Sequence, residues 1–190
     1  MLKRCLGMFL VWLSLASPVA LAGDEASESV TIKEIRKNCS VIDSNKTYGK
    51  VQIDVMDKSV EGGVAIGYFD RNDLKKITEK LYGEMGNWTS EYYFDDGNLI
   101  FVFIQNRQYK RPQTVEEAIE KGFGPVYRTE NARCYFSGDK LIRKLVQWFD
   151  NAGNLIPSGG PEYNSLEISE IDLVSGAEEL KKRIKNKRRT

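Results

Sequence analysis

The sequence predicts an α+β domain: an antiparallel meander sheet of about seven to eight strands built from repeated hairpins, with an N-terminal helix, a short inserted helix and a C-terminal helix. Three observations predict it. Apolar and polar residues alternate along several segments, as in strands with one buried face. Short turns rich in Asp, Asn and Gly separate these segments. A pair of aromatic residues recurs immediately before such turns, so we expect the hairpins to be copies of one unit.

The first 22 residues have the organisation of a cleavable signal peptide. Two basic residues precede an apolar core over 6–16, and Ala20 and Ala22 are the small residues expected at a cleavage site. The core is about half the roughly 20 residues that a spanning helix needs, which makes a retained anchor the less favoured alternative. We expect cleavage after Ala22 and a periplasmic or secreted mature protein that does not span a membrane.

The rest of the chain divides into two parts. Residues 23–156 carry the hairpin repeat and are expected to form one domain, and residues 157–190 are expected to form a linker and a C-terminal helix with a basic tail. The whole chain has 28 Lys and Arg residues against 27 Asp and Glu, but residues 181–190 contain seven basic residues and no acidic one. Cations are favourable at a helix C-terminus, which is the interpretation we favour. Contact with anionic lipid or polysaccharide is the alternative.

The domain opens with a helical pattern. Apolar residues recur at intervals of three, four and three, at Ile32, Ile35, Cys39 and Ile42. Thr31 and Glu34 form a capping-box pattern, so we expect a helix over 31–44. The pattern then changes, because residues 51–55 alternate between apolar and polar, and a glycine turn joins this expected strand to a second one over 64–69.

An internal repeat supplies most of the sheet. Each copy has Tyr-Phe, a short polar turn and then Leu, and the copies are Tyr68–Leu74, Tyr93–Leu99 and Tyr135–Leu141, with a looser one at Trp148–Leu155. Aromatic residues before a tight polar turn predict a β-hairpin. Residues 74–81 also fit a short amphipathic helix, but they occupy the place of the outgoing strand in the other copies, which favours a strand.

The remaining elements follow from local patterns. Six consecutive apolar residues at 99–104 have no polar face, so this strand is expected to be central and covered on both sides. A capping-box pattern at 114–117 predicts the short inserted helix, and a last strong hairpin is expected over 126–149. Ala177, Leu180 and Ile184 follow Ser175 at helical spacing and predict the C-terminal helix.

One stretch carries a resemblance to known proteins. The residues from Glu91 to Phe103, Glu-Tyr-Tyr-Phe-Asp-Asp-Gly-Asn-Leu-Ile-Phe-Val-Phe, resemble the signature of a loose group of exported, uncharacterised bacterial proteins. In that group a short helix begins the mature chain and further hairpins of the same kind follow. The hairpins are also faintly similar to repeats of the membrane occupation and recognition nexus type, although the copies here are unevenly spaced. Neither resemblance implies an activity.

Two cysteines, Cys39 and Cys134, follow the expected cleavage site. An even number of cysteines in an exported protein predicts a disulfide bond, which would stabilise the fold by about 4 to 5 kcal/mol if it closed so long a loop without strain. Two separately buried thiols are the alternative.

The residue content limits the chemistry. The chain has no histidine, which excludes Ser-His and Cys-His nucleophiles and histidine metal ligands. Ser137 and Lys140 match the Ser-x-x-Lys pattern of penicillin-recognising enzymes, but a turn is the wrong setting for that nucleophile. Glu91, Asp95 and Asp96 could form a carboxylate pair, although acids beside a turn are more often solvated. We therefore expect no catalytic, metal or cofactor site.

Aromatic residues offer the better indication of function. Side chains alternate along a strand, so in each copy Tyr and Phe face opposite sides of the sheet. One row is expected in the core, and the other is expected to form a binding surface that includes Tyr68, Trp88, Tyr93 and Tyr135. Burial of both rows under helices is the alternative. The sequence thus favours an exported, non-enzymatic domain that binds a protein, peptide or glycan and no nucleic acid. A histidine-independent carboxylate hydrolase acting on cell-wall or carbohydrate substrates is the second hypothesis.

Overall fold

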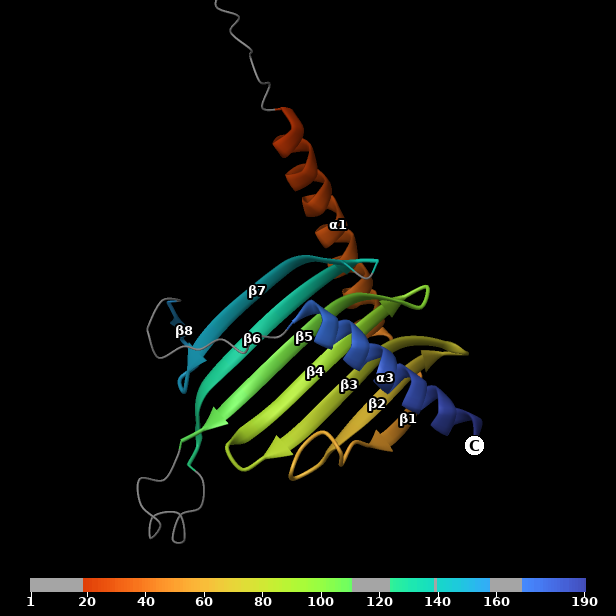
Figure 1. Cartoon of the computed structure of the whole chain (residues 1–190), viewed down its shortest axis with the longest axis vertical. Coiled ribbons are helices and arrows are strands. Elements are labelled where there is room, and N and C mark those ends of the chain that lie inside the picture. The colour runs from red at the N-terminus through yellow and green to blue at the C-terminus, as the bar shows by residue number, and fades with distance from the viewer. Residues whose placement is uncertain (1–18, 111–123, 139, 158–168) are drawn as a thin grey trace, which may run out of the picture.

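The computed structural model describes residues 19–110, 124–138, 140–157 and 169–190. One curved sheet has a helix lying diagonally across one face, and a second helix contacts the other face near one end of the strands (Figure 1). The elements are α1 Val19–Ser44, β1 Gly49–Asp54, β2 Gly63–Asp70, β3 Asp73–Gly83, β4 Gly86–Asp95, β5 Asn98–Tyr109, β6 Val126–Ser137, β7 Lys140–Asp150, β8 Leu155–Ile156 and α3 Glu170–Arg189.

The sheet is a meander. Its eight strands lie in the order in which they occur along the chain, and every neighbouring pair is antiparallel. This confirms the predicted α+β fold class and the hairpin organisation. The ambiguous residues 74–81 lie within β3, so the strand inferred from the repeat is confirmed and the amphipathic helix is not formed.

The repeat has a structural explanation. In each of the three copies the Phe and the Leu are cross-strand partners, in the pairs Phe69 with Leu74, Phe94 with Leu99 and Phe136 with Leu141. The register shifts immediately beside each of these pairs, as at a β-bulge. All six side chains lie against or within the core on the α3 side of the sheet. The Tyr that precedes each Phe faces the other side, because side chains alternate along a strand.

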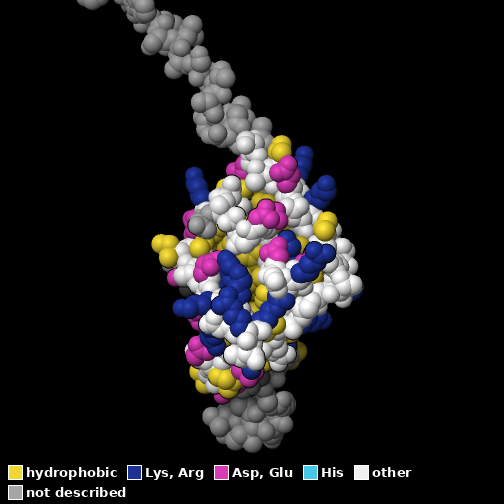
Figure 2. Space-filling model, turned by 90° about the vertical axis from the view of Figure 1, so that its right-hand side faces the viewer, with side chains coloured by type: hydrophobic (Ala, Val, Ile, Leu, Met, Phe, Trp, Pro, Cys, Tyr) yellow, Lys and Arg dark blue, Asp and Glu magenta, His cyan; other side chains and the backbone are white. Residues whose placement is uncertain are grey.

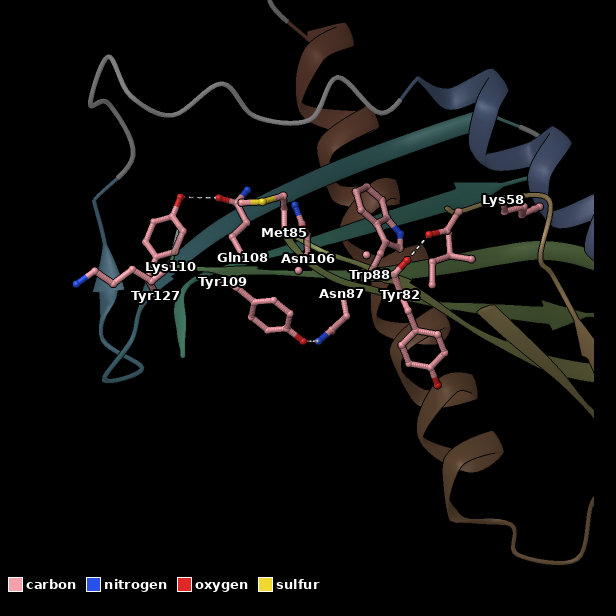
Figure 3. A pocket seen from close by; sticks show the side chains of 14 residues that line it. Lys58, Tyr82, Met85, Asn87, Trp88, Asn106, Gln108, Tyr109, Lys110 and Tyr127 are labelled. Atoms are coloured by element: carbon pink, nitrogen blue, oxygen red, sulfur yellow. Dashed lines mark hydrogen bonds between the residues drawn. The ribbon is translucent and has the colours of Figure 1, made fainter. Parts of the chain in front are cut away.

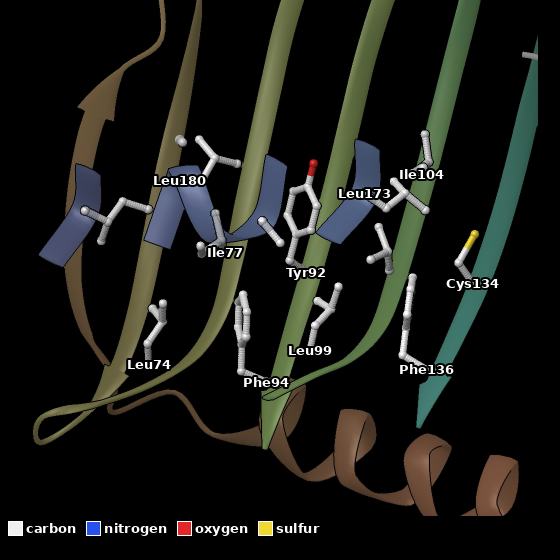
Figure 4. Packing of buried hydrophobic residues seen from close by; sticks show 14 of the residues in the cluster. Leu74, Ile77, Tyr92, Phe94, Leu99, Ile104, Cys134, Phe136, Leu173 and Leu180 are labelled. Carbon is white, nitrogen blue, oxygen red and sulfur yellow. The ribbon is translucent and has the colours of Figure 1, made fainter. Parts of the chain in front are cut away.

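Helix α3 covers the main core (Figure 4). It buries Leu173, Ala177, Leu180 and Ile184 against the sheet, and these side chains share one helical face. The helix begins earlier than the sequence pattern indicates, since Ser169 caps it by accepting a hydrogen bond from the Asp172 backbone N–H at 3.1 Å. Ser175 therefore lies inside the helix.

Helix α1 covers part of the opposite face. Ile32 and Ile35 are buried there with Tyr135, and Ile100 and Phe101 of β5 pack against them. Strand β5 is thus covered on both sides, as predicted, because Leu99, Val102 and Ile104 belong to the core under α3. The helix is already present at Val19, the first described residue, and does not start at Thr31, whose hydroxyl instead donates to the Ser27 carbonyl within the helix at 3.1 Å.

The predicted disulfide is absent. Cys39 and Cys134 are both free thiols, because they lie on opposite sides of the sheet. Cys134 belongs to the core under α3, whereas Cys39 packs with the cluster under α1. The alternative of two separately packed thiols is therefore correct. The sheet between the two thiols prevents the approach of about 4 Å between Cβ atoms that a disulfide requires.

Several predicted segments lie outside the described residues. They are the inserted helix over 114–122, most of the linker after Pro157 and most of the expected signal peptide, residues 1–18. Within the described residues, neither helix is long and apolar enough to cross a membrane.

Candidate binding site

A pocket of about 760 Å³ opens at one end of the sheet (Figure 3). It lies at the end opposite the Tyr-Phe turns, where β3 turns into β4, β5 ends and β6 begins. We call it the strand-end pocket. Its lining residues are Lys58, Ser59, Leu81, Tyr82, Gly83, Met85, Gly86, Asn87, Trp88, Asn106, Gln108, Tyr109, Lys110 and Tyr127.

A tight turn shapes one wall of this pocket. Gly83 and Gly86 are the cross-strand partners that close the β3–β4 hairpin. A Cβ atom at Gly86 would collide with the Arg107 carbonyl, so only glycine lets the turn approach β5 this closely. The Tyr109 N–H donates to the Met85 carbonyl at 3.0 Å, which holds the end of β5 against the turn. The position of this wall is therefore determined by backbone contacts between the turn and β5.

Trp88 supplies an aromatic surface on the α3 side of the sheet. Its cross-strand partners are Leu81 on β3 and Asn106 on β5, which also line the pocket. The indole N–H donates to the Ser90 hydroxyl at 2.7 Å, and this bond orients the ring. The Trp88 indole and the Asn106 carboxamide thus lie side by side, an apolar plane beside a group that can both donate and accept hydrogen bonds.

Gln108 of β5 is hydrogen-bonded to the start of β6 beside the pocket. Its Oε1 accepts hydrogen bonds from the Tyr127 hydroxyl at 3.0 Å and from the Arg128 guanidinium at 2.8 Å. Both contacts use the carbonyl oxygen of the carboxamide, and no described residue occupies its N–H₂ group, which can donate to a ligand. The Tyr127 side chain is 45% exposed, so an aromatic ring with a fixed hydroxyl is presented at the rim.

A second pair of lining residues includes Asn87, which precedes Trp88 on β4 and therefore faces the opposite side of the sheet. The Asn87 carboxamide donates to the Tyr109 hydroxyl at 2.8 Å, and both residues line the pocket (Figure 3). Tyr82 lies next to Asn87 in register and is 39% exposed. On each side of the sheet, the lining of the pocket thus contains an aromatic ring and a carboxamide that lie close together: Trp88 with Asn106 and Tyr109 with Asn87.

The charge of the lining is positive. Its charged residues among those described are Lys58 and Lys110, and none of the described lining residues is acidic. Lys58 forms an ion pair with Glu79 at 3.3 Å, and Glu79 is only 3% exposed. The Tyr92 hydroxyl donates to the same carboxylate at 3.3 Å. Burial, reinforced by the negative charge of Glu79, raises the pKa of Tyr92, so this phenol stays protonated and helps to hold the carboxylate that anchors Lys58.

The four residues predicted to form one binding surface do not lie together in the structure. Trp88 faces the α3 side and lines the strand-end pocket. Tyr68, Tyr93 and Tyr135 face the other side, where Tyr93 and Tyr135 are only 3% and 2% exposed. Tyr68 is half-buried, with the Lys50 ammonium 5.5 Å from its ring centre. Both aromatic rows are thus buried in the second and third copies.

Tyr93 is the centre of a polar contact between α1 and the sheet. Its hydroxyl lies 2.8 Å from the Glu91 carboxylate and 3.0 Å from that of Asp43, at the end of α1. The Lys76 ammonium lies 2.8 Å from the same hydroxyl and from Asp43, and it balances part of the negative charge. Burial and the two carboxylates raise the pKa of Tyr93. The arrangement attaches the helix to the sheet.

The residues that the sequence analysis considered as catalytic groups do not form a shared site among the described residues. Asp95 accepts a hydrogen bond from Asn38 at 3.1 Å, and Asp96 lies in the β4–β5 turn with φ of 47°. Ser137 and Lys140 are the closing partners of the β6–β7 hairpin, so the Ser-x-x-Lys pattern belongs to a turn. Among the described residues, no group of three acidic or cysteine side chains could hold a metal ion.

Two buried carboxylates were not among the sequence candidates. Glu79 and Glu130 are each 3% exposed and face the α3 side. They lie on β3 and β6, with β4 and β5 between them. At about 4.8 Å per strand this separates them by roughly 14 Å. Paired carboxylates in glycosidases lie about 5 to 9.5 Å apart, so these two do not form such a pair.

The polar residues of the pocket could not be identified from the sequence. Asn87, Asn106 and Gln108 have no shared motif, and only the strand register brings them together. The available signal was the recurrence of Tyr and Trp beside the turns at this end of the sheet, at Tyr82, Trp88, Tyr109 and Tyr127.

Comparison with known proteins gives no relative: no protein-family description, no curated protein and no solved structure matches this chain.

Proposed function

We propose that this chain is an exported, non-enzymatic binding domain whose strand-end pocket holds part of a peptide or glycan ligand. The observation that carries the proposal is the composition of the pocket: aromatic rings of Trp88, Tyr109 and Tyr127 combined with the carboxamides of Asn87, Asn106 and Gln108. Aromatic rings contribute contact area, and carboxamides supply donors and acceptors that fix the orientation of a ligand.

The size and rigidity of the pocket support the proposal. A volume of about 760 Å³ is within the range of small-molecule and cofactor sites, about 300 to 1,000 Å³. Its polar groups are held by hydrogen bonds from Tyr127 to Gln108 and from Asn87 to Tyr109. Side chains that are already ordered lose little conformational entropy when a ligand binds.

The charge of the pocket limits the kinds of ligand that it is expected to bind. Lys58 is already paired with Glu79, so Lys110 is the main source of positive charge, and none of the described lining residues is acidic. A neutral or anionic ligand is therefore favoured over a cationic one. The export proposal rests separately on the signal-peptide pattern of the first 22 residues.

The test is a titration of isotope-labelled protein with a panel of neutral oligosaccharides and short uncharged or acidic peptides, followed by amide chemical shifts. Binding is expected to move the signals of residues 82–88 and 106–110 and the side-chain amides of Asn87, Asn106 and Gln108. The double variant Gln108→Ala, Tyr127→Ala should weaken binding by about tenfold or more, since it removes a hydrogen-bonding group and an aromatic contact. Tyr68→Ala, on the other face, is the matched control. A ligand that binds the double variant and the parent protein equally would contradict the proposal.

A further inference from the structure

A second hollow lies at the C-terminal end of α3. It has a volume of about 410 Å³ and is lined by Phe69, Asn72, Lys185, Arg188 and Arg189. Three of these five residues are cations, and none of the described lining residues carries a side-chain carboxylate. Figure 2 shows the edge of the molecule where α3 ends, and Lys and Arg side chains gather near the middle of this face.

The three cations project from neighbouring turns of one helix. Lys185 and Arg189 are four residues apart and Lys185 and Arg188 are three apart, so they share one side of α3. Like charges at these spacings repel one another, although the negative end of the helix dipole attracts each of them. An anion placed among them would reduce the mutual repulsion of the three cations.

No ion pair among the described residues neutralises the charges of this hollow. Within the described chain, the α3 cations that form ion pairs are Lys181 and Arg183, and none of these pairs uses the three cations of the hollow. Arg188 donates to the Arg71 carbonyl and to the Asn72 carboxamide, which are neutral acceptors. Its guanidinium also lies 4.3 Å from the centre of the Phe69 ring. These contacts hold Arg188 in place while its positive charge stays available.

We propose that this hollow is an oxyanion site that binds a phosphate group, through Lys185, Arg188 and Arg189. Guanidinium groups present several donors in a fixed plane that matches phosphate oxygens, and an ammonium adds a compact charge. The Asn72 carboxamide lies beside them and can donate a further hydrogen bond. The phosphate could be a free anion or the headgroup of a phospholipid. The site is distant in sequence from the strand-end pocket, and the inference does not depend on the function proposed for that pocket.

The test uses residues 23–190 and two probes: inorganic phosphate, followed by calorimetry, and vesicles of phosphatidylcholine with or without phosphatidic acid, followed by co-sedimentation. The variant Lys185→Gln, Arg189→Gln removes two charges at exposed positions, and Gln preserves helix propensity. The control Lys33→Gln, Lys37→Gln removes the same charge from α1. Arg188 is left intact because it contacts the β2–β3 turn.

We expect the parent protein to bind at least one probe and the α3 variant to lose about tenfold or more in affinity, with the α1 control close to the parent. Binding of free phosphate identifies a soluble phosphate ligand, whereas binding only to vesicles with phosphatidic acid identifies the lipid headgroup. Binding should weaken as salt is added, because the cations are exposed. The proposal is wrong if the parent binds neither probe, or if the α1 control loses as much affinity as the α3 variant.

Discussion

Ile184 of α3 packs directly on Gly67 of β2. A Cβ atom at Gly67 would lie 2.5 Å from Cγ2 of Ile184 and 3.2 Å from the Phe69 ring, and Ile184 is fully buried. The end of α3 therefore lies so close to the sheet that the helix position depends on the absence of a side chain at residue 67.

We expect Gly67→Ala to lower the free energy of unfolding by about 1 to 3 kcal/mol, since the added methyl overpacks the core. Gly176 provides the control, because it lies inside α3 and a Cβ atom added there would meet no atom within 4 Å apart from its chain neighbours and the backbone of its own helix. Gly176→Ala should therefore raise stability by about 0.5 to 1 kcal/mol. Urea denaturation measures both. Equal effects of the two substitutions would contradict the packing of α3 on β2.

Tyr93 and Tyr135 differ in how much they contribute to the attachment of α1. Tyr93 contacts Asp43, Glu91 and Lys76, whereas Tyr135 accepts a single hydrogen bond from Arg36 at 3.2 Å. Tyr93→Phe should lower the free energy of unfolding by about 1 to 2 kcal/mol, because charged groups lose a hydrogen-bond partner. Tyr135→Phe should lower it by less than about 1 kcal/mol. Denaturation monitored by circular dichroism compares them.

Substitution of either tyrosine by serine is expected to be more severe. Both rings are almost fully buried, so Tyr93→Ser and Tyr135→Ser should each cost about 3 to 5 kcal/mol. A stable, soluble serine variant would show that the ring lies at the surface instead.

The two cysteines should react slowly in the folded protein. Burial, and to a smaller extent Asp43, raises the pKa of Cys39 from 9.0 to about 12, and burial also raises the pKa of Cys134. Alkylation at pH 8 should therefore be much slower than in guanidinium, where both thiols are exposed. Non-reducing mass spectrometry should find two free thiols, and a disulfide between them would contradict the placement of the cysteines on opposite faces.

The raised pKa of Cys39 predicts how the stability of the protein depends on pH. Above about pH 9 the unfolded chain loses the Cys39 proton while the folded protein keeps it, so unfolding becomes more favourable as pH rises towards about 12. The stability contributed by the protonated thiol is complete below about pH 9 and declines through this window. Cys39→Ser should make the decline shallower in urea denaturation series between about pH 8 and about pH 11.

Removal of residues 1–22 is expected to leave the described packing intact. Helix α1 includes residues from Val19 on, but the first described contact of its side chains with the sheet is the ion pair of Glu28 with Arg143, at 3.8 Å. We expect the exported protein to begin at Gly23, as measured by intact mass and N-terminal sequencing. Ala20→Leu with Ala22→Leu should block processing, because the cleavage site needs small residues.

The hairpins could be predicted because their information is local. A strand alternates between two faces, and a polar turn after Tyr-Phe closes the hairpin, so a few adjacent residues determine each unit. The ends of the helices were less predictable. Thr31 has the capping-box pattern, yet α1 continues past it, since a hydroxyl can bond to the preceding turn and a helix extends once it is nucleated.

By itself, the sequence determined the meander of hairpins and the fact that Tyr and Phe of each copy face opposite sides of the sheet. Tertiary structure decided which helix covers each side, and this placed Cys39 and Cys134 apart and buried Tyr93 and Tyr135. It also assembled the strand-end pocket, because Asn87, Asn106 and Gln108 meet only through the register of β4 with β5 and the closing of the turn at Gly86. Alternation along one strand is a property of adjacent residues, whereas the identity of what lies above a strand depends on segments distant in the chain.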